Sequence, residues 1–255
     1  MYQGKAGRDN YRDSLKGIGN HARQYLLYLE NHDERRLASP IDVGGDRPDN
    51  SGFGSATAAR QLAPLQYLAT AGPILLYNGQ ELGETGAGDE GFGGEDGRTS
   101  IFDYWSMPSF TAWVGADHSY RDDALTVQQR ALRNWYGAIL RLAQDVSARA
   151  DTSVWLDGDA RLYAVARFAP GSERLLVIAS NFSVGMALKT PLRIPSSVLE
   201  DAGLSGSVTV RKVLDEKGAT DAKLADTTTS ELSSSGFALD VPDQTGHVFV
   251  IEKRR

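Results

Sequence analysis

The sequence contains no cysteine, and this absence removes several kinds of chemistry from consideration. Disulfide bridges, thiolate metal ligands and cysteine nucleophiles are all excluded. The cellular compartment stays open, because secreted proteins can also lack disulfides. Any catalytic or binding site must therefore be built from other side chains.

Long apolar runs and an excess of positive charge are also missing. No stretch approaches the roughly 18 apolar residues that a membrane span requires. The 27 Lys and Arg residues are outnumbered by 33 Asp and Glu residues, which gives a net charge of −6. Neutralising nucleic-acid phosphates needs the opposite balance. We therefore expect neither a membrane nor a nucleic acid as a partner.

The beginning of the chain, MYQGKAGRDNYRDSLKG, is polar and has no apolar stretch of signal-peptide length. Nothing in it marks the start of a domain. This pattern is expected of a chain that begins within a larger protein.

Two short apolar runs, separated by a helical pattern, give the first half of the chain an α/β character. Residues 25–29 (YLLYL) and 74–77 (ILLY) are unbroken apolar runs, as in strands that are buried on both faces. Residues 55–71 between them favour a helix, with Ser55 as a candidate N-cap and Pro64 predicting a kink or a later start. The order strand, helix, strand indicates an α/β fold.

The rest of the chain divides into an irregular segment, a helix and a β-rich region. Residues 83–123 are rich in glycine and show little periodicity. Residues 125–146 carry an apolar stripe at helical spacing, formed by Leu125, Leu132, Trp135, Ile139, Leu142 and Val146. Five β-rich runs then follow, at 153–156, 162–168, 175–180, 208–214 and 247–252. They predict an antiparallel β-sandwich, in which the Ser/Thr-rich stretch 227–235 forms a loop.

Polar residues follow both apolar runs directly. Asn31, His32 and Asp33 come after the first run, and Gln80 and Glu81 come after the second. In parallel α/β barrels the carboxyl ends of the strands open onto one mouth, where the catalytic groups lie. An adjacent His and Asp there could bind sugar hydroxyls and a developing positive charge. Taken by themselves, the same residues also fit ordinary polar loops, which are more common.

Three segments resemble motifs of the α-amylase family, glycoside hydrolase family thirteen. Residues 25–36 (YLLYLENHDERR) resemble the motif at the family's seventh barrel strand. Residues 72–83 (GPILLYNGQELG) resemble the segment at its eighth strand, although the family has one residue between the Gly and the Pro. Residues 97–108 (GRTSIFDYWSMP) resemble a further segment of some members. The helix over 125–146 and the β-rich end match the last barrel helix and the C-terminal domain in order and length.

The resemblance implies both a fold and a set of roles. The expected fold is an incomplete (β/α)8 TIM barrel, the last two β/α units in residues 1–147, followed by an antiparallel β-sandwich domain in residues 148–255. Asp33 matches the family's carboxylate that stabilises the oxocarbenium-like transition state. His32 matches a residue that hydrogen-bonds the sugar, and Asn31 and Glu81 are expected to bind substrate beside it. The implied substrates are starch or maltooligosaccharides.

The same resemblance implies that two catalytic groups are missing. Retention needs a carboxylate nucleophile and an acid/base about 5–5.5 Å apart. In the family both precede the Asn-His-Asp motif by more residues than are available here, so this chain alone is expected to be inactive and to need an N-terminal half. Residues 45–49 (GDRPD) fit the nucleophile pattern, but they follow Asn-His-Asp and no apolar strand leads into them. We therefore reject them.

No cofactor is expected in this chain, although the resemblance allows calcium in an intact parent. An oxygen-rich cation site could be formed by Asp89, Glu90, Glu95 and Asp96, but a solvated acidic loop is the simpler interpretation. A function of a different class also stays open, that of an amylase-like protein which binds glycans or another protein without catalysis.

Overall fold

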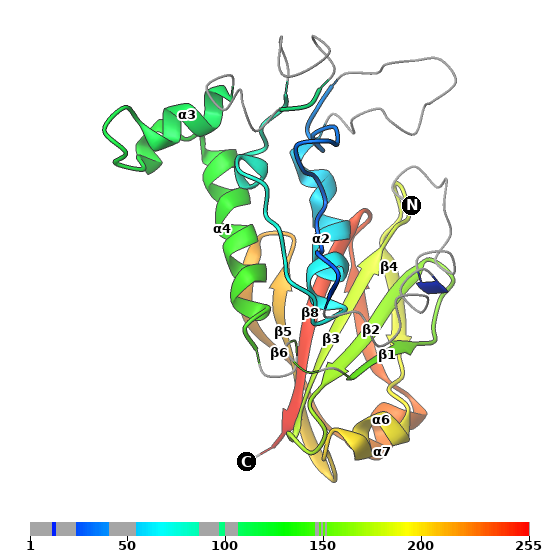
Figure 1. The fold of residues 1–255 in the computed structure, drawn as a ribbon. Coiled ribbons are helices and arrows are strands. Elements are labelled where there is room, and N and C mark those ends of the chain that lie inside the picture. The colour runs from blue at the N-terminus through cyan, green and yellow to red at the C-terminus, as the bar shows by residue number, and fades with distance from the viewer. Residues whose placement is uncertain are drawn as a thin grey trace. The chain divides into compact units, whose positions relative to one another are not determined.

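The computed structural model describes residues 12–13, 24–40, 55–86, 97–99, 107–145, 148, 150 and 152–254. The chain forms two compact units, the first made of residues 1–27, 60–73 and 138–255 and the second of residues 28–59 and 74–137. Helix α4 (Val127–Leu142) runs from the second unit into the first. Figure 1 shows the elements of both units.

The first unit is built on antiparallel β-sheet. Six strands form one sheet in the order β1-β2-β3-β8-β5-β6, and β4 pairs with β7 in a second sheet (Figure 1). Their bounds are β1 (Thr152–Leu156), β2 (Leu162–Phe168), β3 (Arg174–Asn181), β4 (Leu188–Leu192), β5 (Ser207–Asp215), β6 (Gly218–Thr228), β7 (Phe237–Val241) and β8 (Thr245–Lys253). Every pairing among these eight strands is antiparallel, as the sequence predicts.

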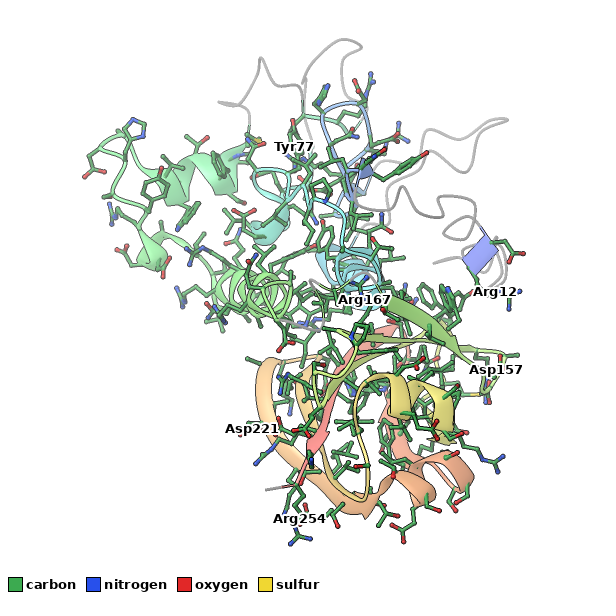
Figure 2. The ribbon with its side chains drawn as sticks, turned by 60° about the horizontal axis from the view of Figure 1, so that its bottom comes forward. Arg12, Tyr77, Asp157, Arg167, Asp221 and Arg254 are labelled. Carbon is green, nitrogen blue, oxygen red and sulfur yellow. The ribbon has the colours of Figure 1, made fainter. Side chains whose placement is uncertain are left out.

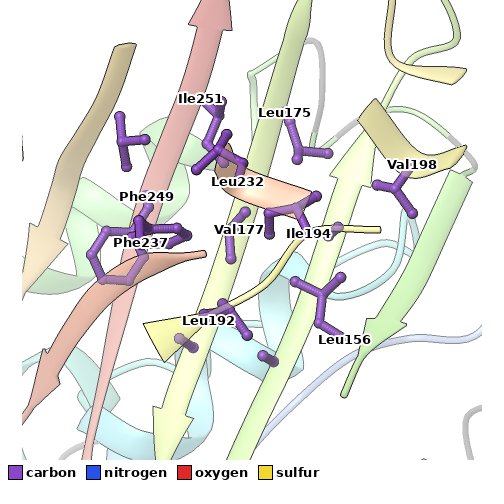
Figure 3. Packing of buried hydrophobic residues seen from close by; sticks show 14 of the residues in the cluster. Leu156, Leu175, Val177, Leu192, Ile194, Val198, Leu232, Phe237, Phe249 and Ile251 are labelled. Atoms are coloured by element: carbon purple, nitrogen blue, oxygen red, sulfur yellow. The ribbon is translucent and has the colours of Figure 1, made fainter. Parts of the chain in front are cut away.

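A single hydrophobic core joins the two sheets and the short helices α6 (Ser196–Asp201) and α7 (Thr229–Ser234). Val177 and Phe249 reach it from the large sheet, Leu192 and Phe237 from the small one (Figure 3). The rings of Phe237 and Phe249 meet edge to face, with centroids 5.3 Å apart. The predicted β-sandwich is confirmed in this arrangement.

The central strands β2 and β3 of the large sheet are also covered on the other face of the sheet, which explains why they read as apolar runs without alternation. Every residue of β2 is buried. Helix α2 (Ala59–Leu68) and the residues after it lie against this face: the Ser153 hydroxyl donates to the Ala69 carbonyl at 2.8 Å. The buried guanidinium of Arg167, labelled in Figure 2, donates to the Ala148 and Ala150 carbonyls. A sandwich strand with two covered faces does not alternate.

Three strands, β4, β6 and β7, are not predicted by the sequence pattern. β6 (GATDAKLADTT) consists mainly of small and polar residues and forms one edge of the large sheet. β4 carries Pro191, and β7 is only five residues long. Such strands are specified by the neighbour with which they pair more than by their own propensity.

The Ser/Thr-rich stretch is not a loop, contrary to the prediction. Its first residues end β6, and α7 follows at once. The Thr228 hydroxyl accepts a hydrogen bond from the Glu231 amide, and the Glu231 carboxylate accepts one from the Thr228 amide. This reciprocal capping box satisfies two amides that a helix start otherwise leaves unpaired.

We expect Thr228→Ala to lower the free energy of unfolding of the sandwich by about 1 kcal/mol, because the Glu231 amide loses its acceptor. Urea denaturation of the chain measures the change. Ser230→Ala, in the same helix but outside the capping box, is the matched control and should stay within about 0.5 kcal/mol of the original chain. Equal effects of the two variants would contradict the capping role.

The two long helical predictions are confirmed, with shorter bounds. Residues 55–71 form the 3₁₀-helix η3 (Ala56–Ala58) and α2, with Pro64 inside α2. The stripe of the second helix is buried at Leu132, Trp135 and Ile139 in α4. No helix among the described residues is long and apolar enough to cross a membrane.

The two buried strands predicted at residues 25–29 and 74–77 are not formed. Leu27 and Ile74 are single bridge residues, and the Leu27 amide donates to the Pro73 carbonyl at 2.7 Å. Tyr25 and Leu26 are each 51% exposed. A parallel pair is stable only within a wider sheet covered on both faces, and the described residues supply no further strand beside these two segments. The incomplete barrel is therefore not confirmed.

The segment predicted to be irregular, residues 83–123, contains the short helix α3 (Pro108–Val114) and the start of the 3₁₀ turn η6 (Asp122–Ala124) in its described part. The turn η4 (Gln80–Leu82) comes just before it. Leu82, Trp113 and Leu125 form a small hydrophobic cluster in the second unit. The rejected nucleophile pattern at 45–49 and the acidic residues at 89–96 lie outside the described residues.

Candidate functional site

The predicted Asn31, His32 and Asp33 lie on one turn of the second unit. The Asn31 side-chain Oδ1 accepts hydrogen bonds from the Asp33 amide at 2.8 Å and from the Glu34 amide at 3.0 Å. An Asn that bonds the backbone two and three residues ahead closes a turn by itself. The side-chain oxygen of Asn31 is thus used inside the protein, where the sequence suggests a substrate contact.

The closed turn presents His32 and Asp33 outward. The His32 Nε2 lies 3.3 Å from an Asp33 carboxylate oxygen, and the two side chains are 45% and 71% exposed. An imidazole and a carboxylate that lie side by side in water offer a polyol one hydrogen-bond donor and two acceptor oxygens. The pair can therefore contact a ligand without any rearrangement of the core.

One buried ion pair, Arg36 with Glu30, brackets this turn. The Arg36 Nη1 donates to Glu30 Oε1 at 2.8 Å, and the Leu37 amide donates to Glu30 Oε2 at 2.7 Å. Both side chains are almost completely buried. The residue before the turn is therefore joined to the residues after it by charge-assisted hydrogen bonds, which are the stronger kind.

The second predicted segment is held by different contacts. Tyr77, labelled in Figure 2, donates from its hydroxyl to the Thr99 carbonyl at 2.7 Å. Gly79 follows with φ of 85°, a conformation that favours glycine, and the Gln80 amide bonds back to the Tyr77 carbonyl at 2.9 Å. The Gln80 side chain donates to the Tyr136 hydroxyl at 3.0 Å, so Gln80 is an internal residue.

Glu81 carries the one carboxylate of this segment. Its Oε2 is buried and has no hydrogen-bond partner among the described residues. Burial raises the pKa of the Glu81 carboxyl, while Arg133 and Arg36 oppose the increase. No hydrogen bond or ion pair in the described part of the chain joins Glu81 to His32 or Asp33.

A further buried carboxylate, Glu84, was not singled out by the sequence. Its Oε2 accepts hydrogen bonds from the Ser109 and Phe110 amides, both at 3.1 Å, at the start of α3. Burial raises the pKa of the Glu84 carboxyl as well, and these two amides and Arg36 oppose the increase. Glu84 thus acts as a structural cap. A Glu after a turn gives no sign in the sequence that it will be buried.

These raised pKa values predict a pH dependence. Burial raises the pKa of the Glu30, Glu81 and Glu84 carboxyls above the ordinary value of 4.5. In the interval between the ordinary and the raised values, the folded state binds more protons than the unfolded state, so stability falls as pH rises. Their contribution is fully present below about pH 4.5 and is lost as pH rises through the folded pKa values.

We therefore expect the second unit to resist urea better at pH 5 than at pH 7.5, as measured by hydrogen exchange of α4 amides before residue 138. Glu81→Gln should weaken this dependence, because it removes the buried charge and keeps the size of the side chain. An unchanged pH profile in that variant would contradict the assignment of the effect to Glu81.

Comparison with known proteins gives matches at the level of structure. No protein-family model and no curated protein matches this sequence. The α-amylase from Geobacillus thermoleovorans, in complex with acarbose, is 15% identical with a TM-score of 0.56, over 96% of this chain and 43% of that one. A maltogenic α-amylase from Thermotoga neapolitana is 12% identical with a TM-score of 0.56, over 99% and 48%. An α-glucosyl transfer enzyme is 17% identical with a TM-score of 0.54, over 96% and 44%.

These identities establish likeness of fold, and the chain spans less than half the length of the structures that it matches. Together with the three motifs, the matches show that this chain is similar in fold, over nearly its whole length, to the C-terminal part of α-amylase-family structures.

Proposed function

We propose that this chain is the C-terminal portion of a retaining glycoside hydrolase of the α-amylase type, which acts on α-glucosidic bonds of starch or maltooligosaccharides. The observation that carries the proposal is the exposed His32–Asp33 pair, fixed on the Asn31 turn of a chain with an α-amylase-like fold. Some of the similar structures are complexes with acarbose or maltose, which supports an oligosaccharide as the ligand.

Each site residue has a distinct proposed role. The Asp33 carboxylate opposes the positive charge that develops on the sugar in the transition state, and His32 donates a hydrogen bond to a sugar hydroxyl. Asn31 shapes the turn that carries them. Glu81, whose Oε2 has no hydrogen-bond partner among the described residues, is proposed to bind the substrate beside them.

The domain organisation forms part of the proposal. Residues 1–147 supply the last two β/α units of a catalytic barrel and residues 148–255 the C-terminal domain. The segments around Leu27 and Ile74, now single bridge residues, would become strands beside the rest of the barrel. The nucleophile and the acid/base would come from that preceding part, so the present chain by itself lacks turnover.

A metal has no part in this proposal. Among the described residues, no group of three His, Asp or Glu side chains is placed to hold an ion.

The 255-residue chain is expected to show no turnover of soluble starch or of a chromogenic α-glucoside. The reason is chemical, since retention requires a nucleophile and an acid at a fixed separation and Asp33 serves as neither. An Asp33→Ala chain is the control. Turnover that is present in the original chain and absent in this control would reveal a complete site within the chain. It would overturn the proposal that the nucleophile and the acid/base come from another part of the protein.

The positive test uses the complete open reading frame of the gene. It should encode an Asp-bearing and a Glu-bearing strand before this segment, and its product should hydrolyse starch with retention of configuration. A reading frame without those strands, whose product binds maltose but never cleaves it, would replace the proposal by the non-catalytic alternative.

A further inference from the structure

The Arg36 guanidinium is in contact with all three segments that resemble family motifs. Nη1 bonds Glu30 in the first segment, and Nη2 donates to the Asn78 carbonyl of the second at 2.8 Å. Nε donates to the Thr99 hydroxyl of the third at 2.6 Å, and Nη2 also lies 3.1 Å from the Met107 sulfur. The three segments are far apart in sequence and meet at one side chain.

The backbone of Arg36 adds a further link, and its ring contact fixes the plane of the guanidinium. The Arg36 amide donates to the Gly97 carbonyl at 2.8 Å. The guanidinium carbon lies 4.2 Å above the centroid of the Tyr77 ring. The Arg36 side chain is 0% exposed, so its N–H donors bind protein atoms and not water. Few rotations remain open to it.

These contacts determine where the exposed turn stands. Glu30 and Leu37 are joined at the base of the turn, and Arg36 fixes that base to Asn78, three residues before Glu81. Asn31 shapes the turn but makes no such link to the other segments among the described contacts. The location of His32 and Asp33 relative to the second segment therefore depends on Arg36.

The charge of Arg36 also links these segments. The Glu30, Glu81 and Glu84 carboxyls are all removed from water, and Arg36 lowers the pKa of each against the effect of burial. One buried cation thus serves as counter-charge to three acidic side chains. A lysine carries the same charge but lacks the planar fork that three separate acceptors require.

We infer that Arg36 is the positioning residue of this site, which holds the Asn31–Asp33 turn in register with the Asn78–Glu81 segment. The sugar-binding purpose of that register rests on the proposed function, but the register itself does not. Arg36 touches no ligand in this scheme and acts only through the turn.

The test is Arg36→Lys in the 255-residue chain, with ¹⁵N relaxation as the measurement. We expect the order parameters of the Asp33 and Glu34 amides to fall from about 0.85 to below about 0.6, while those of Trp135 and Tyr136 in α4 stay near 0.85. If Arg36 only stabilised the unit as a whole, the order parameters of all four amides would fall by similar amounts. Arg121→Lys, at an exposed pair with Asp123, is the control and should change none of them.

Thr99→Val is the second variant, because it keeps the shape of the side chain and removes only the acceptor of Arg36 Nε. It should also lower the order parameters of the Asp33 and Glu34 amides. If Arg36→Lys fails to fold, this variant still tests the positioning role of Arg36. Rigid Asp33 and Glu34 amides in a folded variant would overturn the inference.

A separate titration with acarbose isolates the proposed function. In the unchanged chain, acarbose should shift the Asp33 resonance, and Arg36→Lys should remove that shift. A chain in which Arg36→Lys loosens the turn, but acarbose shifts nothing, would retain the positioning role and reject the sugar-binding role of the turn.

Discussion

Asp33→Asn, placed in a polypeptide that carries this segment within a complete catalytic unit, is expected to lower kcat by about 100-fold or more. The substitution keeps the size of the side chain and removes the charge that would face the oxocarbenium-like transition state. Asp33 is 71% exposed and its amide remains bonded to Asn31, so the fold should not change. Steady-state kinetics on a maltooligosaccharide gives kcat and KM separately.

The companion variant for this experiment is His32→Ala. It removes a hydrogen bond and no full charge, so its loss should be smaller and should include an increase in KM. Unchanged circular dichroism of both variants is the control for folding. Near-original turnover of Asp33→Asn would show that the motif has been assigned to the wrong chemistry.

The sequence predicts the sandwich better than it predicts the first half of the chain, and the reason lies in which contacts each half needs. β2 and β3 carry mainly apolar side chains and find their partners within the chain. Residues 25–29 are equally apolar, but the described residues offer them one bridge and leave Tyr25 and Leu26 half exposed. An apolar run predicts burial only when its covering partner is present.

The candidate site shows the same limit in a different form. A motif identifies His32 and Asp33 because exposed chemistry depends on residue type, but Arg36 and Glu84 go unnoticed because nothing in a residue's identity reveals that it will be buried. One signal was available: Glu30 and Arg36 are opposite charges placed on either side of an exposed polar triplet. Such a pair closes a loop when it becomes desolvated.

Arg36→Met is expected to destabilise the second unit by about 3–5 kcal/mol, since it leaves the Glu30 charge buried without its partner. Methionine replaces the aliphatic stem of arginine but has no guanidinium, so the contact of that group with the Tyr77 ring is lost together with the ion pair. Urea denaturation, monitored by hydrogen exchange of α4 amides before residue 138, gives the stability of that unit. The amides of β3 and β8 give the first unit, which should not change.

The double variant Glu30→Gln/Arg36→Met separates charge from packing. Removing both charges eliminates the desolvated carboxylate, so the double variant should be more stable than Arg36→Met alone. The loss in Arg36→Met should also shrink as pH falls, because burial already raises the pKa of Glu30 and removal of Arg36 raises it further, so that the carboxyl takes up a proton. Equal losses in the single and double variants, constant with pH, would mean that Arg36 stabilises this unit through packing and not through the Glu30 pair.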